Sequence, residues 1–235
     1  MITKLQEAIK QSKNIVFFTG AGISTDSGIP DFRSATGLYK NNYRAEEILS
    51  HTFFMANPEE FYEFYKTKMI YEDAKPNYGH IFMKEVEDLG KNVTVVTQNI
   101  DGLHQAAGSK NVLELHGSVL RNNCMKCGKF YDLKSIMLKK GVPICECGGI
   151  IKPDVVLYEE GLNPDTMSNT VEAISNADLL IVCGTSLNVY PAASFLMYFQ
   201  GKTLAIINKD ATPKDELADI IIHDSISNVF KQIKL

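Results

Sequence analysis

The feature that most constrains the fold is a series of short, almost uninterrupted apolar runs with helical patterns between them. They span residues 15–18, 93–96, 178–183, 203–207 and 219–222. A strand that is covered on both faces needs apolar side chains at nearly every position, whereas a half-exposed strand alternates. Such runs separated by helical stretches indicate a mostly parallel sheet. We therefore expect an α/β fold with helices on both faces of the sheet.

The composition is that of a folded globular domain, with 45% hydrophobic and 22% charged residues in a chain of 235. The formal net charge of −4 gives no overall attraction to nucleic acid, so we expect no specific nucleic acid binding. The apolar runs are far shorter than the roughly 20 residues that cross a bilayer. Residues 1–9 predict an amphipathic helix and not a signal peptide. We expect a cytoplasmic protein without a membrane partner, and the sequence leaves the oligomeric state open.

Two segments interrupt the α/β alternation. Residues 37–76 are rich in Phe, Tyr, Glu and Lys, and Asn57-Pro58 places a capping residue and a proline where a helix would begin. Residues 120–153 contain two Cys-Gly corners and no long periodic segment. We expect a main domain from 1–36, 77–119 and 154–235, and a small domain formed by the helical insertion 37–76 and the module 120–153.

Four of the five cysteines are clustered in two pairs: Cys124 and Cys127, then Cys145 and Cys147. Cysteines of a cytosolic protein are poor candidates for disulfides, and two thiolate pairs separated by a loop fit tetrahedral zinc. A redox-active pair is the alternative. Four thiolates leave no open coordination position, so we expect a structural zinc ion.

A glycine turn follows the first predicted strand and reads Gly20-Ala21-Gly22-Ile23-Ser24-Thr25. With a helix after it, such a turn lets backbone amides approach a pyrophosphate. The third glycine of the dehydrogenase fingerprint is missing, and no strand ending in Asp or Glu follows at the expected distance. The motif therefore favours a nucleotide phosphate site but not an ordinary dehydrogenase, and a purely structural turn is the alternative.

Further motifs follow this turn in a fixed order. They are Ser27-Gly28-Ile29-Pro30-Asp31-Phe32-Arg33, Thr97-Gln98-Asn99-Ile100-Asp101, His116-Gly117, the cysteine pairs, and Gly184-Thr185-Ser186-Leu187 with Pro191-Ala192. Over nearly its whole length the chain resembles the sirtuin family of NAD-dependent protein lysine deacylases. The resemblance implies a Rossmann-like NAD-binding domain, acyl-lysine protein substrates, and a reaction that consumes NAD. Its products would be nicotinamide, free lysine and O-acyl-ADP-ribose.

The resemblance also implies roles for individual residues. Ile100 and Asp101 would hold the nicotinamide carboxamide, Gln98 and His116 would face the nicotinamide ribose, and Phe32 would shield the reacting carbon from water. The remaining NAD contacts would come from Gly20, Ala21, Gly22, Thr25, Asp31, Arg33, Asn99, Gly184, Thr185, Ser186, Asn208 and Ile226. Asn99, Asp101 and His116 would be the catalytic residues, although Asn99 and Asp101 alone would read equally well as structural caps.

His116 is the predicted general base. A lone histidine is usually a surface group or a satisfied core residue, but His116 lies beside the other motifs. Its unperturbed pKa near 6.5 suits proton abstraction close to neutral pH. The other four histidines, at positions 51, 80, 104 and 223, lie outside such motifs, and we interpret them as structural or surface residues.

Substrate recognition is predicted at two places. Val155, Val156, Leu157 and Tyr158 match the family segment that pairs with the substrate backbone as an added strand. Glu159 replaces the glycine that is usual there, and one residue separates Cys145 from Cys147 where the family usually has two or more. Tyr65 and Lys68 match a Tyr and Arg pair of family members that prefer succinyl- or malonyl-lysine. Lysine offers only a point charge, and packing or solvated surface is the alternative for both residues.

Two rival functions remain on sequence grounds. A mono-ADP-ribosyltransferase would use the same fold, but Asn99, Asp101 and His116 together favour deacylation. A non-catalytic NAD-sensing module would bind NAD without releasing nicotinamide.

Overall fold

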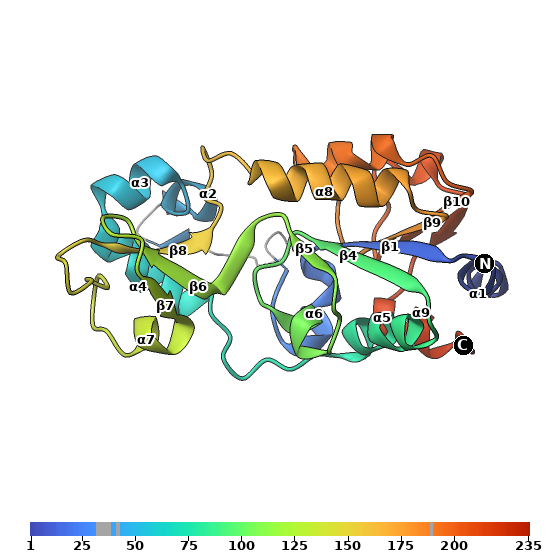
Figure 1. The fold of residues 1–235 in the computed structure, drawn as a ribbon, viewed down its shortest axis with the longest axis horizontal. Coiled ribbons are helices and arrows are strands. Elements are labelled where there is room, and N and C mark those ends of the chain that lie inside the picture. Colours follow the sequence, from blue (N-terminus) through green and yellow to red (C-terminus); the bar gives the residue numbers. More distant parts are fainter. Residues whose placement is uncertain (32–38, 41–42, 189) are drawn as a thin grey trace.

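A six-stranded sheet forms the centre of the computed structural model, which describes residues 1–31, 39–40, 43–188 and 190–235. Its order is β11-β10-β9-β1-β4-β5, and every neighbouring pair is parallel (Figure 1). The strands are β1 (Asn14–Thr19), β4 (Asn92–Thr97), β5 (Val112–Glu114), β9 (Leu179–Cys183), β10 (Thr203–Ile207) and β11 (Ile220–Ile222). All five predicted strands are confirmed, and they form the α/β class expected from the sequence.

The uninterrupted apolar runs are explained by burial on both faces of the sheet. In β1, Ile15 and Phe17 belong to one apolar cluster, whereas Val16 and Phe18 belong to the cluster on the opposite face. Successive side chains of a strand point to opposite faces, so both sets must be apolar when helices cover both sides.

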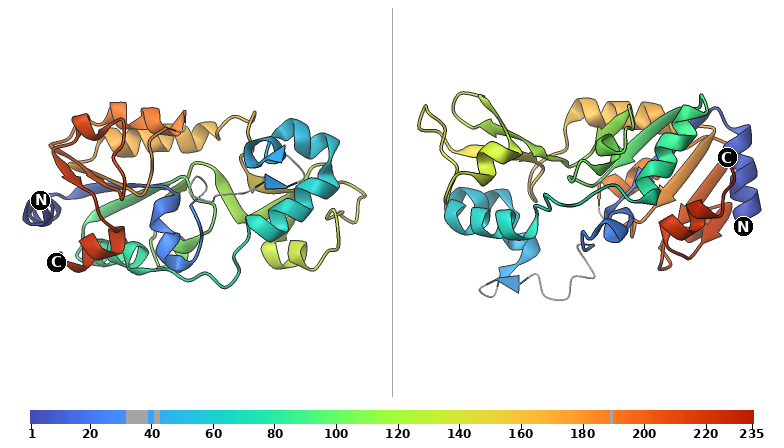
Figure 2. Two further views of the ribbon diagram at one scale, coloured as in Figure 1. Left: turned by 180° about the vertical axis from the view of Figure 1, so that it is seen from behind. Right: turned by 90° about the horizontal axis from the view of Figure 1, so that it is seen from below.

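Helices cover the two faces as separate layers (Figures 1 and 2). α1 (Ile2–Gln11), α5 (Tyr78–Asp88) and α9 (Ile226–Lys231) contribute to one cluster. α8 (Pro164–Ser175) and the 3₁₀ helix η3 (Ala192–Tyr198) contribute to the other. The short helix α6 (Leu103–Ala106) follows β4, and the 3₁₀ turn η4 (Asp215–Leu217) precedes β11.

A smaller lobe lies at one end of the molecule (Figure 1). It contains the antiparallel sheet β7-β6-β8, made of β6 (Gly117–Cys124), β7 (Phe130–Asp132) and β8 (Ile151–Val155). Its helices are α2 (Ala45–Ile48), α3 (His51–Ala56), α4 (Pro58–Lys68) and α7 (Leu133–Met137), and the short pair β2 (Tyr39–Lys40) and β3 (Tyr43–Arg44) precedes α2. One apolar cluster joins α4 to β6 and β8, so both chain insertions share a core.

Two local expectations are corrected. The helix predicted after the glycine turn is instead a pair of 3₁₀ turns, η1 (Ala21–Ile23) and η2 (Thr25–Ser27). The second turn ends at Gly28, whose φ of 84° is left-handed, so an α-helix cannot continue. Asn57 occupies the N-cap position of α4, as predicted, but its side chain makes no capping hydrogen bond.

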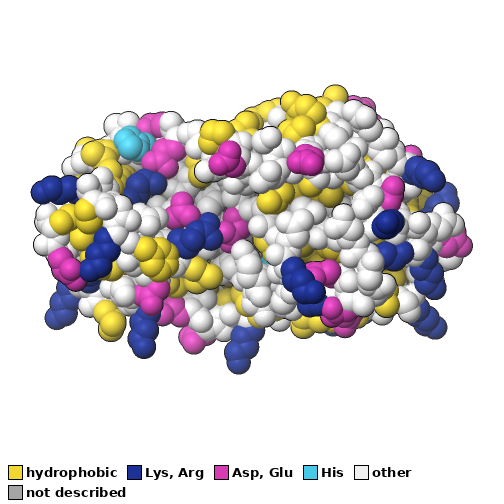
Figure 3. Space-filling model, viewed as in Figure 1, with side chains coloured by type: hydrophobic (Ala, Val, Ile, Leu, Met, Phe, Trp, Pro, Cys, Tyr) yellow, Lys and Arg dark blue, Asp and Glu magenta, His cyan; other side chains and the backbone are white. Residues whose placement is uncertain are grey.

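The surface mixes charge types. Acidic and basic side chains are interspersed over the face shown in Figure 3. Among the described helices, none combines the length and the apolar character that a membrane span requires.

Two loops pack tightly where β1 and β9 end. The amide of Gly22 donates to the carbonyl of Gly184 at 2.8 Å. A Cβ atom on Gly22 would lie 2.8 Å from the Cα of Gly184, which is too close for any side chain. Gly20 is under the same restriction, because its Cβ would lie 2.7 Å from the Cβ of Thr185. The glycine turn therefore has a structural reason of its own: it lets the two loops meet.

Candidate functional site

The predicted site residues gather at the carboxyl edge of the main sheet. Within this sheet, the strand that follows β1 in chain order, β4, lies on one side of β1, whereas β9 lies on its other side. In open parallel sheets, ligands bind where the strand order diverges in this way. The loops that follow β1, β4, β5, β9 and β10 all begin at this edge, and they carry the glycine turn, Gln98, His116, Gly184 and Asn208.

Gln98 connects four of these strand ends. Its amide donates to the carbonyl of Thr19 at the end of β1 at 3.0 Å. Its side-chain Nε2 donates to Thr185 Oγ1 after β9 at 3.0 Å, and its carbonyl lies 2.9 Å from Nδ1 of His116 after β5. Gln98 therefore fixes the relative positions of the loops that meet at this edge of the sheet.

The contact with Gln98 determines which nitrogen of His116 is basic. A carbonyl only accepts, so Nδ1 of His116 carries the proton, and Nε2 of the neutral ring keeps its lone pair. Burial lowers the pKa of His116 from its usual 6.5, and this effect exceeds the opposing effect of the hydrogen bond to Gln98. The ring is therefore neutral at neutral pH and can accept a proton at Nε2.

Gly117 determines how the chain leaves His116. It has a φ of 74°, and a Cβ there would lie 1.9 Å from the carbonyl oxygen of Asp154, so only glycine fits. The carbonyl of His116 accepts from the amide of Val156 at 3.0 Å. The predicted base and the predicted substrate segment are thus one hydrogen bond apart.

Asn99 and Asp101 are joined by Ser24, which the sequence analysis did not select. The hydroxyl of Ser24 donates to Asp101 Oδ2 at 2.7 Å and accepts from Asn99 Nδ2 at 3.0 Å. Asp101 Oδ1 accepts from the amide of Leu103 at 2.9 Å. Both carboxylate oxygens of Asp101 are therefore held, and the side chains of Asn99 and Asp101 have fixed orientations.

Two buried histidines lie behind this group. The amide of Asn77 donates to Nδ1 of His80 at 3.3 Å, so Nε2 of His80 carries the proton toward Ser24 Oγ at 3.4 Å. Burial lowers the pKa of His80 to about 4 and that of His104, whose ring lies 4.8 Å away, to about 3. His104 also hydrogen-bonds Thr19 Oγ1 at 3.0 Å. As expected from the sequence, both are structural histidines, but they support Ser24 and Thr19 beside the site.

This edge has free donors that suit a dinucleotide. Within the described residues, the backbone amides of Ala21, Thr25 and Thr185 have no acceptor. They follow β1 and β9, and Thr185 is only 7% exposed, so oxygens of a bound phosphate or ribose would satisfy donors that are partly shielded from water. Because His80 and His104 are neutral, these two residues contribute hydrogen bonds and no positive charge beside this edge of the sheet. The donor set therefore fits NAD.

The other predicted NAD contacts are placed as follows. Ser186 is half-buried after Thr185, and the amide of Asn208 donates to the carbonyl of Ile222 at 3.1 Å. Ile100 is half-buried and packs against the core of the smaller lobe. Ile226 is buried in the main core beside Gly79, so its side chain is occupied by packing. Asp31 is half-buried, whereas Phe32 and Arg33 lie outside the described residues.

The substrate candidates fall into two groups. Tyr65 is fully buried, stacked on Phe61, and its hydroxyl has no hydrogen-bond partner in the described structure. Burial raises the pKa of Tyr65 and keeps it neutral, whereas Lys68 is exposed three residues later on α4. Val155 and Leu157 are buried in the smaller lobe, and the Tyr158 ring is exposed.

The backbone of this segment is only partly paired. The amide of Tyr158 donates to Leu49, and its carbonyl accepts from the amide of His51. Within the described part of the chain, the carbonyl of Val156 and the amide of Glu159 have no partner. An extended peptide could pair with these two groups.

The four clustered cysteines fit one tetrahedral metal ion. Their sulfur atoms lie within 4.8 Å of one another, with 3.4 Å between Cys124 and Cys147 and 3.7 Å between Cys127 and Cys145. Four thiolates around zinc at the usual bond length lie about 3.8 Å apart, whereas a disulfide needs about 2.05 Å. The short spacing between Cys145 and Cys147 therefore still brings both sulfurs to the site. The hydroxyl of Tyr131 also donates to Cys145 Sγ at 3.2 Å.

We predict that this site holds one structural zinc ion per chain. Cys147→Ser should lose most of the metal after dialysis against a chelator and melt at a lower temperature, because three thiolates bind zinc less tightly. Cys183→Ala is the matched control: Cys183 lies in β9, away from the cluster, and this variant should keep its zinc. Metal analysis after dialysis measures both. Zinc retained at full stoichiometry by Cys147→Ser would contradict the four-cysteine site.

Comparisons with known proteins agree with this geometry. The model of the Sir2 family matches residues 20–191. An NAD-dependent protein deacetylase of Clostridium perfringens (strain 13 / Type A) is 57% identical over 99% of this chain and 98% of its own length. A solved Sir2 structure with a p53 peptide and NAD+ has a TM-score of 0.88 and 37% identity, covering 99% of this chain and 96% of that one. A Sir2 variant with a deacetylated p53 peptide and 3′-O-acetyl ADP-ribose has a TM-score of 0.89 and 38% identity, covering 98% and 96%. The chain therefore belongs to the Sir2 family.

Proposed function

We propose that this protein is an NAD-dependent protein deacetylase. The observation that carries the proposal is the position of His116, whose Nε2 lone pair is left free by the Gln98 contact at the sheet edge where the polar loops converge. The curated relatives at 57%, 56% and 50% identity are each named NAD-dependent protein deacetylase, and each match covers nearly the whole chain. NAD+ would supply an electrophilic ribose carbon once nicotinamide leaves, and ADP-ribose would carry the acetyl group away.

The residues around Ser24 would bind and orient the nicotinamide end. An amide and a carboxylate provide the donors and acceptors that a carboxamide requires. Asn99 and Asp101 are already oriented by Ser24 before any ligand binds, so little ordering would oppose binding. Ser24 and His80 would act as positioning residues, because Ser24 bonds Asn99 and Asp101 and His80 in turn bonds Ser24.

His116 would remove a proton from a ribose hydroxyl at Nε2. The Gln98 carbonyl then stabilises the ring once it is charged, since it accepts from Nδ1 in both protonation states. Gln98 also contacts Thr185, so the same residue orients the base and one wall of the nucleotide crevice.

Acyl-lysine proteins would bind as an added strand. The free carbonyl of Val156 and the free amide of Glu159 would pair with the substrate backbone, a mode that reads few side chains. The amide of Val156 is already bound to the carbonyl of His116, which would place the substrate beside the base.

The proposal extends to acidic acyl groups through Tyr65 and Lys68. The buried hydroxyl of Tyr65 has no hydrogen-bond partner within the described structure, so an acyl carboxylate that reached the interior of the smaller lobe would meet an unused donor. Lys68 could add a positive charge, although its exposure makes the contribution small.

We also infer a cytoplasmic location. All five cysteines are unpaired, which suits a reducing compartment.

The first test is nicotinamide release from NAD in the presence of an acetyl-lysine peptide. Wild type should release nicotinamide together with deacetylated peptide, and His116→Ala should be slower by about 100-fold or more because the base is lost. His223→Ala is the histidine control and should keep most of the activity. Nicotinamide release with the peptide still acetylated would favour ADP-ribosyl transfer, and NAD binding without release would favour a sensing module.

The second test concerns acyl preference. If Lys68 binds a carboxylate, Lys68→Ala should lower the ratio of succinyl- to acetyl-lysine turnover by about two- to fivefold, the size expected for an exposed charge pair. Lys75→Ala, which removes an exposed lysine from the loop after α4, should leave the ratio unchanged. Competing the two peptides in one reaction gives the ratio directly. Absence of succinyl turnover in the wild type would end this part of the proposal.

A further inference from the structure

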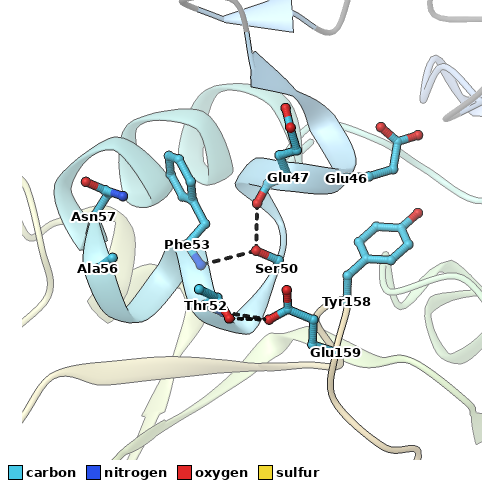
Figure 4. Close-up of a pocket in the computed structure, with 9 residues that line it drawn as sticks. All are labelled: Glu46, Glu47, Ser50, Thr52, Phe53, Ala56, Asn57, Tyr158 and Glu159. Carbon is cyan, nitrogen blue, oxygen red and sulfur yellow. Dashed lines mark hydrogen bonds between the residues drawn. The ribbon is translucent and has the colours of Figure 1, made fainter.

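A groove lies in the smaller lobe beside the segment that follows β8. It has a volume of about 440 Å³ and lies between α2, α3 and residues 158–159 (Figure 4). It is separate from the carboxyl edge of the main sheet. None of the residues assigned above to NAD, to catalysis or to zinc lines it.

The groove has an apolar wall and an acidic rim. Phe53, Ala56 and the exposed ring of Tyr158 supply the apolar surface. Glu46, Glu47 and Glu159 supply carboxylates, and no lysine or arginine lines the groove among the residues that the structure describes. Glu46 is exposed, and no ion pair is recorded for it within the described structure. An occupant with an apolar stem and a positive end would match both parts.

Glu159 is held in place at the edge of the groove. Its carboxylate accepts from the amide of Thr52 at 2.9 Å and from Thr52 Oγ1 at 2.7 Å (Figure 4). These bonds keep the pKa of Glu159 below its usual value, so the carboxylate is charged at neutral pH. Glu159 adopts a φ of 76°, a conformation that favours glycine, and the contacts with Thr52 stabilise it.

The groove continues the surface proposed for the substrate backbone. Tyr158 pairs with the α2–α3 connection through its amide and carbonyl, and its side chain lines the groove (Figure 4). The unpaired amide of Glu159 and carbonyl of Val156 belong to the same segment. A peptide paired with these groups would therefore pass the groove with side chains flanking its acyl-lysine.

We propose that the groove binds a lysine or arginine side chain of the substrate protein, close in sequence to the acyl-lysine. This inference rests on the proposed deacetylase function. The methylene stem would lie along Phe53, Ala56 and Tyr158, and the positive end would meet the exposed carboxylate of Glu46 on the acidic rim. An acidic side chain would be repelled by the carboxylates of this rim.

The test uses a set of acetyl-lysine peptides that differ at one flanking position at a time. Each position carries alanine, arginine or glutamate, and kcat/KM is measured with the full-length protein and NAD. At one or more positions, arginine should raise kcat/KM over alanine by about two- to fivefold, and glutamate should lower it, as expected for partly exposed charge pairs. The preference should weaken as salt is raised.

Variants assign the preference to the groove. In the double variant Glu46→Gln, Glu47→Gln, the ratio of arginine to alanine peptide should fall toward one, and Glu46→Lys should invert the ratio of arginine to glutamate peptide. Glu72→Gln is the matched control, because it removes an exposed carboxylate of the same insertion that does not line the groove. Melting temperatures check that the variants fold.

The outcomes separate the two proposals. If the alanine peptide is deacetylated but no position favours arginine, or if the preference survives in the double variant, the groove inference is overturned and the deacetylase function stands. If no peptide is deacetylated, the proposed function fails and the inference falls with it.

Discussion

The site depends on the hydrogen bonds of Gln98. Its amide, carbonyl and side chain contact Thr19, His116 and Thr185, which follow or end three different strands. The glycine contact between Gly22 and Gly184 brings the loops after β1 and β9 together next to Thr185, which Gln98 bonds. A packing constraint between two loops and a hydrogen-bonding residue that follows a third strand therefore together place His116, the proposed base, at the carboxyl edge of the sheet.

The two lobes are coupled at the same place. The carbonyl of His116 accepts from the amide of Val156. Next to this bond, Gly117, the first residue of β6, pairs with Val155, the last residue of β8. The substrate segment is then fixed to the α2–α3 connection through Tyr158 and Glu159. The proposed base His116, the proposed peptide-binding segment and the groove thus lie along one continuous hydrogen-bonded path. A substrate strand that reaches His116 would therefore also pass the charged rim of the groove, where a flanking side chain could contact it directly.

Much of this could be predicted from the sequence, for identifiable reasons. The apolar runs predicted the strands because burial on two faces requires apolar residues at every position, as β1 shows. The cysteine cluster was predictable because few other sites need four thiolates. Ser24, His80 and His104 were missed as supporting residues, since a buried polar contact between distant segments leaves no periodic pattern. The α-helix predicted after Gly22 was wrong because Gly28 ends the turn in a left-handed conformation.

The control of His116 by Gln98 is tested most directly by the protonation state of the His116 ring, measured by nitrogen NMR of the histidine side chains over a pH titration. We predict a neutral ring at neutral pH, with the proton on Nδ1 and a lone pair on Nε2, and a titration midpoint below the usual 6.5. His116→Ala identifies the resonance. A proton on Nε2 of the neutral ring, or a ring still charged at neutral pH, would contradict the role of the Gln98 carbonyl and the assignment of Nε2 as the base.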